Sequence, residues 1–382
     1  MKLLKKIAPL AVALLFAGTT VAAADLANWR ASFPGADTAI VVGSGAAAED
    51  TIGAVDIATA LGVTGGGQAP IEGAHLIEAP GNKLNYGEDL FDVEDTLEKR
   101  DLPTILADGR YKETRGNTDN DVTYEQFIEF YANTGTMDFL QNTEASNKPV
   151  KTYLYFDDAV PAYNYRLVFD NPVEFDPGNV DEDFELTKLK MLGREYFIVD
   201  AAVDANGTVD SLTLMGGALK ASQWEYSKQT YTLGGKSYEV EVKIISDSSE
   251  SAILIINGEE TDELIEGDTY VLEDDTRVGI LDVVPNEGAE KSTGTSEGND
   301  LVTFYLGAEK IEFSHGDEVE INGEPVDGSD VDLKTNAAAG KLAEINLEMT
   351  PGDDLFLAKG ENWTDPILSR FKFTNQGLLS KT

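Results

Sequence analysis

The sequence has 382 residues, of which 69 are Asp or Glu and 29 are Lys or Arg, so its formal net charge is −40 at pH 7. A surface this acidic repels the phosphates of nucleic acids and anionic lipids, which excludes nucleic acid as a partner. The chain has no cysteine, which excludes disulfides, thiolate catalysis and cysteine-held zinc.

The first 24 residues have the features of an export signal. They begin with Lys2, Lys5 and Lys6, continue through an apolar stretch at 10–16, and end in three alanines before Asp25. This pattern predicts a signal peptide that is cleaved after Ala24, and its apolar stretch is too short to span a bilayer. No later stretch approaches the roughly 18 apolar residues of a membrane helix. We therefore expect an exported mature chain without a transmembrane segment.

The next predicted element, at residues 38–61, reads TAIVVGSGAAAEDTIGAVDIATAL. A short β run, a glycine loop and an amphipathic helix follow one another here. Gly43 and Gly45 match the first two glycines of a dinucleotide fingerprint, but Ala48 takes the third place. Ser44 lacks the two glycines that a nucleophile elbow requires. We therefore interpret the glycines as allowing a helix to pack on a sheet, and we expect no nucleotide cofactor.

After about residue 149 the pattern changes to short aromatic or β-branched runs separated by turn residues, which predicts strands at 152–156, 163–169, 195–199 and 211–215. Residues 124–131 fit either a short helix or a strand. Asn-Gly pairs at 206–207, 257–258 and 322–323 predict hairpins with type I′ turns, because Asn and Gly tolerate positive φ. Residues 286–300 are almost without apolar side chains, which predicts a surface loop or a linker.

These patterns define the expected fold class: α+β and predominantly β. We expect an α/β portion that contains the β-loop-α unit, followed by β-sandwich-like domains rich in hairpins. The boundaries that we predict are 1–24 for the signal peptide, 25–148 for the α/β portion, 149–224 for a β-rich domain, 225–335 for an acidic β-rich domain, and 336–382 for a C-terminal segment.

The chain lacks a recognisable catalytic set. Its two histidines, His75 and His315, lie in no zinc-binding pattern. Residues 117–127 superficially resemble a calcium-binding EF-hand loop, but Arg115 falls at the first ligand position and Gln126 replaces the bidentate glutamate. We therefore predict no catalytic residues and no enzymatic activity.

Carboxylates are concentrated between residues 247 and 290, where 14 of them accompany a single basic residue, Arg277. Solvated β faces and turns are the interpretation that we favour for this run. The alternative is a divalent cation site, for which Glu273, Asp274 and Asp275 are the candidate ligands, and Ca²⁺ prefers such oxygen ligands.

Two Asn-x-Thr triplets make Asn206 and Asn362 candidate glycosylation sites, since the chain is expected to be exported. Asn206 also belongs to one of the predicted turns, which is the competing explanation for it.

Several segments, taken in order, resemble archaeal S-layer proteins of the methanococcal and thermococcal type. They are VVGSGAAAEDTIGAVDIATALG at 41–62, DVTYEQF at 121–127, MLGREYFIVDA at 191–201, SLTLMGGA at 211–218, ILIINGEETDELIEGDTYVLEDDTRVGILDV at 253–283 and WTDPILSRFKF at 363–373. Such proteins continue beyond the last of these segments, whereas this sequence ends at Thr382, so the resemblance implies either a fragment or a shortened relative with an incomplete C-terminal segment.

The resemblance implies an extracellular structural protein that self-associates into a two-dimensional lattice at the cell surface. Contacts with other envelope components and bridging by Ca²⁺ are further expectations. The main alternative is an exported module that binds a cell-wall polymer through the β-loop-α unit. Such modules occur as tandem copies, whereas only one such segment is clear here.

Overall fold

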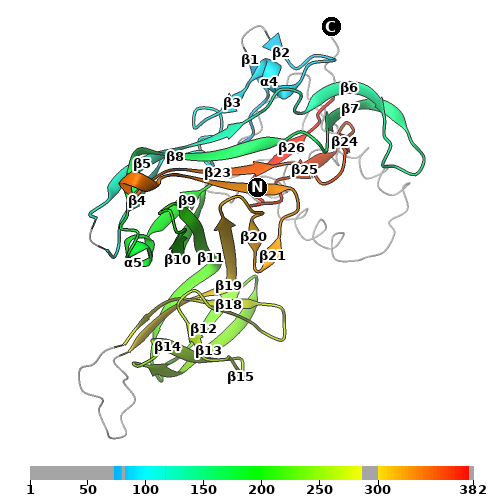
Figure 1. The fold of residues 1–382 in the computed structure, drawn as a ribbon. Coiled ribbons are helices and arrows are strands. Elements are labelled where there is room, and N and C mark those ends of the chain that lie inside the picture. Colours follow the sequence, from blue (N-terminus) through cyan, green and yellow to red (C-terminus); the bar gives the residue numbers. More distant parts are fainter. Residues whose placement is uncertain (1–72, 80–81, 117, 286–299, 378–382) are drawn as a thin grey trace, which may run out of the picture. The chain divides into compact units, whose positions relative to one another are not determined.

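The structure is a computed structural model that describes residues 73–79, 82–116, 118–285 and 300–377. The chain divides into two units, Met1–His75 and Leu76–Thr382, and all elements below belong to the second. Strands hold 54% of the described residues and helices 4%, which confirms the predominantly β prediction (Figure 1). The predicted signal cleavage after Ala24 and the β-loop-α unit at 38–61 lie outside the described residues.

A six-stranded antiparallel sheet has the order β22-β23-β8-β5-β3, and β4 also pairs with β5. Its strands are β3 (Thr96–Leu97), β4 (Gly109–Lys112), β5 (Asp121–Glu129), β8 (Tyr163–Glu174), β22 (Ser329–Asn336) and β23 (Lys341–Met349). Residues 124–131, which fitted either a helix or a strand, therefore lie largely in a strand. In β5 every second side chain from Tyr124 to Ile128 is buried, as expected for a half-buried strand.

An eight-stranded antiparallel sheet has the order β17-β18-β19-β11-β10-β9, and β20 pairs with both β19 and β21. Its strands are β9 (Lys188–Met191), β10 (Arg194–Val203), β11 (Val209–Trp224), β17 (Thr269–Val271), β18 (Arg277–Val284), β19 (Leu301–Ser314), β20 (Glu320–Ile321) and β21 (Glu324–Pro325).

The smaller sheets complete the described β structure. A five-stranded sheet contains β12 (Lys228–Leu233), β13 (Lys236–Ser246), β14 (Ser251–Ile256), β15 (Glu259–Glu260) and β16 (Leu264–Ile265). A three-stranded sheet contains β6 (Thr136–Gln141), β7 (Val150–Phe156) and β24 (Leu355–Leu357). The two-stranded pairs are β1 (Glu78–Ala79) with β2 (Asn82–Lys83), and β25 (Asn362–Thr364) with β26 (Lys372–Thr374). The helical segments are α4 (Leu90–Val93), α5 (Val180–Phe184) and a 3₁₀ turn, η1 (Ala337–Ala339).

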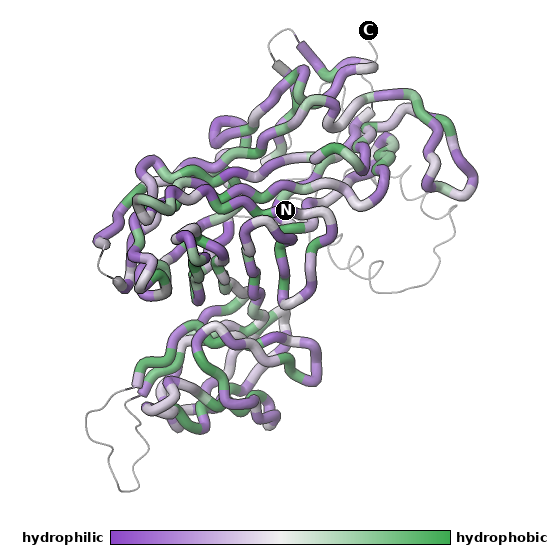
Figure 2. The backbone as a smooth tube through the Cα atoms, in the orientation of Figure 1, coloured by the Kyte–Doolittle hydropathy of each residue, from purple (hydrophilic) through white to green (hydrophobic). Residues whose placement is uncertain are grey.

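Strands β11 and β19 run through two hydrophobic cores. Leu212 of β11 and Phe313 of β19 belong to a large core that also holds buried residues of β5, β8 and β23. At the other end of β19, Phe304 belongs to a second core with buried residues of β13, β14 and β18. Figure 2 shows apolar and polar stretches interspersed along these strands. The long β11–β19 pair thus connects the five-stranded sheet to the rest of the unit.

The predicted hairpins are present, but one turn differs from its prediction. Asn257 and Asn322 have φ of 52° and 55°, and the glycine after each is also positive, as type I′ turns require. Asn206 does not have positive φ; only Gly207 does, at 83°. The Asp204 carboxylate accepts hydrogen bonds from the backbone N–H groups of Asn206 and Thr208, so a longer loop organised by Asp204 replaces the predicted type I′ turn.

The predicted strands at 152–156, 163–169, 195–199 and 211–215 lie inside β7, β8, β10 and β11. Strands from different predicted domains lie in the same sheet. The six-stranded sheet, for example, takes β5 from segment 25–148, β8 from 149–224, β22 largely from 225–335, and β23 from 336–382.

Candidate functional site

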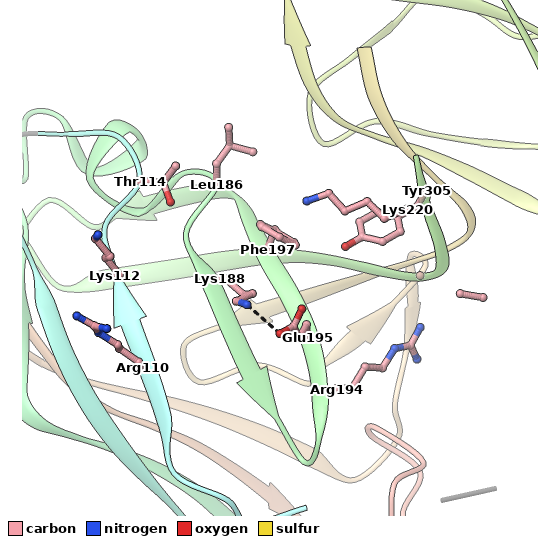
Figure 3. A pocket seen from close by; sticks show the side chains of 12 residues that line it. Arg110, Lys112, Thr114, Leu186, Lys188, Arg194, Glu195, Phe197, Lys220 and Tyr305 are labelled. Carbon is pink, nitrogen blue, oxygen red and sulfur yellow. Dashed lines mark hydrogen bonds and ion pairs between the residues drawn. The ribbon is translucent and has the colours of Figure 1, made fainter. Parts of the chain in front are cut away.

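A basic groove with a volume of about 630 Å³ lies where β4 of the six-stranded sheet approaches β9, β10 and β11 of the eight-stranded sheet. Figure 3 shows cationic side chains arriving from both sides. The groove is lined by Arg110, Lys112, Thr114, Leu186, Lys188, Arg194, Glu195, Phe197, Gly217, Ala218, Lys220 and Tyr305. Five of these residues are basic and one is acidic, in a chain that has more than twice as many acids as bases.

Strand periodicity directs two of the cations into the groove from β4. Side chains alternate between the two faces of a strand, so Arg110 and Lys112 share one face while Tyr111 occupies the other. Tyr111 is fully buried and its hydroxyl donates a 3.1 Å hydrogen bond to the backbone carbonyl of Asp183. Burial of Tyr111 therefore holds Arg110 and Lys112 in the outward position.

The opposite wall depends on a close approach at Gly217. A Cβ atom at this position would lie 2.7 Å from the Tyr305 ring, which is closer than real side chains pack. Because Gly217 has no side chain, the ring of Tyr305 in β19 can lie against β11 and line this wall of the groove. Farther along β11, the Lys220 ammonium lies 3.7 Å from the centre of the Phe197 ring, a cation–π contact.

Three of the five cations are paired with carboxylates. Arg110 donates two parallel hydrogen bonds, of 2.6 and 2.5 Å, to Asp121. Lys188 lies 2.8 Å from Glu195, and Arg194 pairs with Glu309. These ion pairs neutralise three of the five positive charges and restrict the movement of the paired side chains.

Lys112 and Lys220 differ from the other three cations, since neither forms an ion pair with any described residue. Desolvation lowers the pKa of Lys220, while Asp282 and Glu195 oppose that shift through their charges. The two lysines supply the surplus positive charge of the groove. Because they stand on opposite walls, β4 and β11, an anion between them would be held from both sides.

The chemistry of the groove is that of anion binding. Carboxylates and phosphates are the natural partners of Lys and Arg, and Arg binds them in a bidentate manner. Among the lining residues there is no Ser, Cys or His to form a nucleophile–base pair. The sequence analysis missed this groove, although the alternating cations of GRYK at 109–112 and KLK at 188–190 signal two outward-facing basic strands.

The acidic residues that the sequence singled out lie in the turn between β17 and β18. Asp275 has φ of 65°, and the Asp274 carboxylate pairs with Lys236 and accepts a 3.0 Å hydrogen bond from the Tyr238 hydroxyl. The hydrogen bond from Lys236 holds the pKa of Asp274 well below its usual range. Asp274 is therefore already neutralised by a lysine. Whether Glu273, Asp274 and Asp275 bind a cation stays a prediction.

A group of three carboxylates comes together elsewhere, at Asp157, Asp158 and Asp354, where one oxygen from each lies within 4.8 Å of the others. The Tyr155 hydroxyl donates a 2.7 Å hydrogen bond to Asp354. Oxygens of this kind suit a hard cation such as Ca²⁺. The sequence analysis missed the group because β24 brings Asp354 to the end of β7 from 196 positions away.

The two candidate glycosylation sites are both exposed. Asn206 lies in the loop between β10 and β11, and its side-chain amide donates a 2.9 Å hydrogen bond to Asp204. Asn362 begins β25. Both are accessible positions, and their modification stays a prediction.

His315 follows β19, and its Nδ1 accepts a 3.1 Å hydrogen bond from the backbone N–H of Leu333. This histidine therefore joins β22 to the turn after β19.

Helices of the length and apolarity needed to cross a bilayer are not found in the described part of the chain. Comparisons with protein-family models and with curated protein sequences find no match to this chain. The site must therefore be interpreted from its own geometry.

Proposed function

We propose that this protein is a structural subunit of a cell-surface layer, of the archaeal S-layer type, which assembles by self-association outside the cell. Three features support the proposal: the predicted export signal, the strongly acidic composition and the predominantly β architecture.

The observation that carries the proposal is the placement of the segments on which the family resemblance rests. Residues 121–127 lie in β5, residues 191–201 extend from the end of β9 through most of β10, and residues 211–218 lie in β11. The two later segments supply the strands from β14 to β18 and the β25–β26 pair. Segments 121–127, 191–201 and 211–218 therefore belong largely to strands of the two large sheets. Residues 41–62, the first segment of the resemblance, lie outside the described residues.

Self-association by so acidic a protein requires that repulsion between copies be overcome. Divalent cations that bridge carboxylates of neighbouring copies are one means, and Ca²⁺ is the cation that we expect. Under this proposal, excess chelator dissolves the assembly and added Ca²⁺ restores it. Assembly that is unchanged in excess chelator would remove cation bridging from the proposal but not the lattice itself.

Electron microscopy of isolated cell envelopes, with mass spectrometry of their dominant protein, tests the proposed function. We expect a periodic layer in which this chain is a major component. The purified mature chain, examined by negative staining with and without Ca²⁺, provides a second measurement. A protein that is rare in the envelope and stays monomeric in every condition would overturn the proposal.

A further inference from the structure

We propose that the basic groove receives the acidic β20–β21 hairpin of a second copy of this chain, so that copies join head to tail. This inference rests on the proposed function, because it identifies one contact through which a self-associating subunit would assemble. The basic groove is the one lined by the twelve residues named in the preceding description of the site. The acidic hairpin comprises residues 317–327, which contain β20, the Asn322-Gly323 turn and β21.

The acidic hairpin carries negative charge that nothing in its own surroundings neutralises. Residues 317–327 contain five carboxylates and no Lys or Arg. Asp317, Glu318, Glu324 and Asp327 are exposed, and none of them forms an ion pair with a described residue. By contrast, two carboxylates of the acidic run at 247–290 are paired with lysines: Asp274 with Lys236, and Glu260 with Lys243.

The groove is complementary to this hairpin in charge. Lys112 and Lys220, on its two walls, lack carboxylate partners in the described chain, whereas the hairpin has carboxylates without cations. Most of the remaining surface is acidic, so copies that approach in other orientations bring like charges together. Electrostatic complementarity of this kind selects one orientation and speeds encounter.

The two surfaces are separate regions of the eight-stranded sheet, and no ion pair between described residues joins them within one chain. Beside the ends of β11 and β19 that lie near β9, the strand order is β20-β19-β11-β10-β9. The hairpin lies at one edge of this order, and the groove is lined by residues of β9, β10, β11 and β19. Figure 1 shows β20 and β21 on one side of β19, and β9 and β4 beyond β11 on the other side. Strand β19 takes part in both regions, since it pairs with β20 at Ile311 and Glu312 while its Tyr305 lines the groove.

The contact is heterologous because it joins two different surfaces: the groove of one copy binds the hairpin of the next, which leaves a groove and a hairpin free at the two ends. Heterologous contacts of this type generate rings or open rows rather than closed dimers. A row of copies is what a two-dimensional layer needs along one of its directions. Pro325 of the edge strand β21 cannot donate a backbone hydrogen bond, which disfavours pairing of β21 with a strand of another copy.

The test uses charge reversal on the full mature chain. The groove variant is K112E/K220E, and the hairpin variant is E324K/D327K. Both sets of positions are exposed, so folding is expected to persist, and far-ultraviolet circular dichroism and thermal unfolding check it. The matched control for the groove is K148E/K151E, which makes the same change in net charge at two exposed lysines outside the groove lining that also form no ion pair with a described residue.

Sedimentation velocity at low and moderate salt measures association. We expect each variant alone to associate at least about ten-fold more weakly than the control, because like charges then face each other across the contact. An equal mixture of the groove and hairpin variants is expected to recover wild-type association, since every groove can then meet a hairpin of opposite charge. Increasing salt should weaken the wild-type contact.

Three results would overturn the inference. If the wild type associates and the groove variant associates as well as the control, the groove is not the contact and the proposed function is unaffected. If each variant alone associates weakly and the equal mixture of the two does not recover wild-type association, the hairpin is not the partner of the groove. If the wild type never associates, both the inference and the proposed function fail.

Polygalacturonate, an acidic polysaccharide, serves as a second probe of the groove. If the groove variant loses binding to it while associating as well as the control, the groove serves an envelope polysaccharide and the docking of a second copy is wrong. If polygalacturonate competes with association of the wild type, the copy-to-copy contact is supported.

Discussion

The hydroxyl of Tyr163 donates a hydrogen bond to the carboxylate of Asp365, a residue 202 positions later in the chain. Both side chains are buried. The same carboxylate accepts hydrogen bonds of 3.0 and 3.1 Å from the backbone N–H groups of Ile367 and Leu368. Asp365 thereby ties the turn after β25 to the first residue of β8, and it belongs to the WTDPILSRFKF segment of the family resemblance.

Tyr163→Phe should destabilise the protein by about 1–3 kcal/mol, since it leaves a buried carboxylate short of one donor while keeping the aromatic ring. The ring packs edge-on against Phe371 at 5.0 Å, a contact that Phe preserves. Urea unfolding followed by tryptophan fluorescence measures the change. Tyr86→Phe, at an exposed position, is the control and should have little effect. Equal stability of the two variants would contradict a structural role for the Tyr163 hydroxyl.

Gln126→Leu should cost about 2–4 kcal/mol, because several buried polar groups would lose a partner at once. The Gln126 side-chain oxygen accepts hydrogen bonds of 2.7 and 2.9 Å from the Tyr165 hydroxyl and the backbone N–H of Leu192. Its amide nitrogen donates to the carbonyl of Ala107. Glu125→Leu, on the exposed face of the same strand, is the matched control. The difference between their urea midpoints is the measurement, and similar midpoints would show that the buried amide is dispensable.

The stability of the protein should fall as pH rises from about 5 to about 8, in part because of Glu266. Burial raises the pKa of Glu266 to about 8, and the charge of Glu185 adds to the shift, although Arg115 opposes it. The folded state then holds a proton that the unfolded chain has released, so rising pH favours unfolding, by at most about 1.4 kcal/mol per pH unit for one proton. Above about pH 8 Glu266 has lost its proton in the folded state as well, so the stabilisation that this proton provided is no longer present.

Glu266→Gln should flatten that pH dependence, because glutamine cannot ionise. Free energies of unfolding from urea titrations at several pH values give the slope for each protein. Glu250→Gln, at an exposed glutamate, should keep the wild-type slope. A Glu266→Gln slope equal to that of the wild type would mean that this carboxylate does not hold its proton in the folded state.

Gly217→Ala should destabilise the protein by about 1–3 kcal/mol, since the added methyl group would overlap the Tyr305 ring. The neighbouring Ala218 is exposed, so Ala218→Ser serves as the control and should be close to neutral. Thermal unfolding compares the two. Because Tyr305 closes one wall of the groove, Gly217→Ala is also expected to weaken binding of polygalacturonate if that probe binds to the wild type.

Local patterns predicted much of the secondary structure. The aromatic and β-branched runs at 152–156 and 163–169 became strands, and Asn-Gly at 257–258 and 322–323 became type I′ hairpins, because alternation and turn chemistry act over a few residues. The loop at Asn206 departed from its prediction because the carboxylate of Asp204, two residues earlier, captures the backbone N–H groups of the loop.

The sequence by itself determined the predominantly β class, the excess of carboxylates and the outward cations of β4 and β9, since these depend on composition and on a two-residue period. Only the tertiary structure decided that Lys112 faces Lys220 across a groove and that Asp354 joins Asp157. The pairing of strands about 100 to 200 residues apart depends on which buried faces pack together, and no local pattern specifies that choice. The same pairing brings residues of β9, β10, β11 and β19 together in the groove and attaches the acidic hairpin to β19.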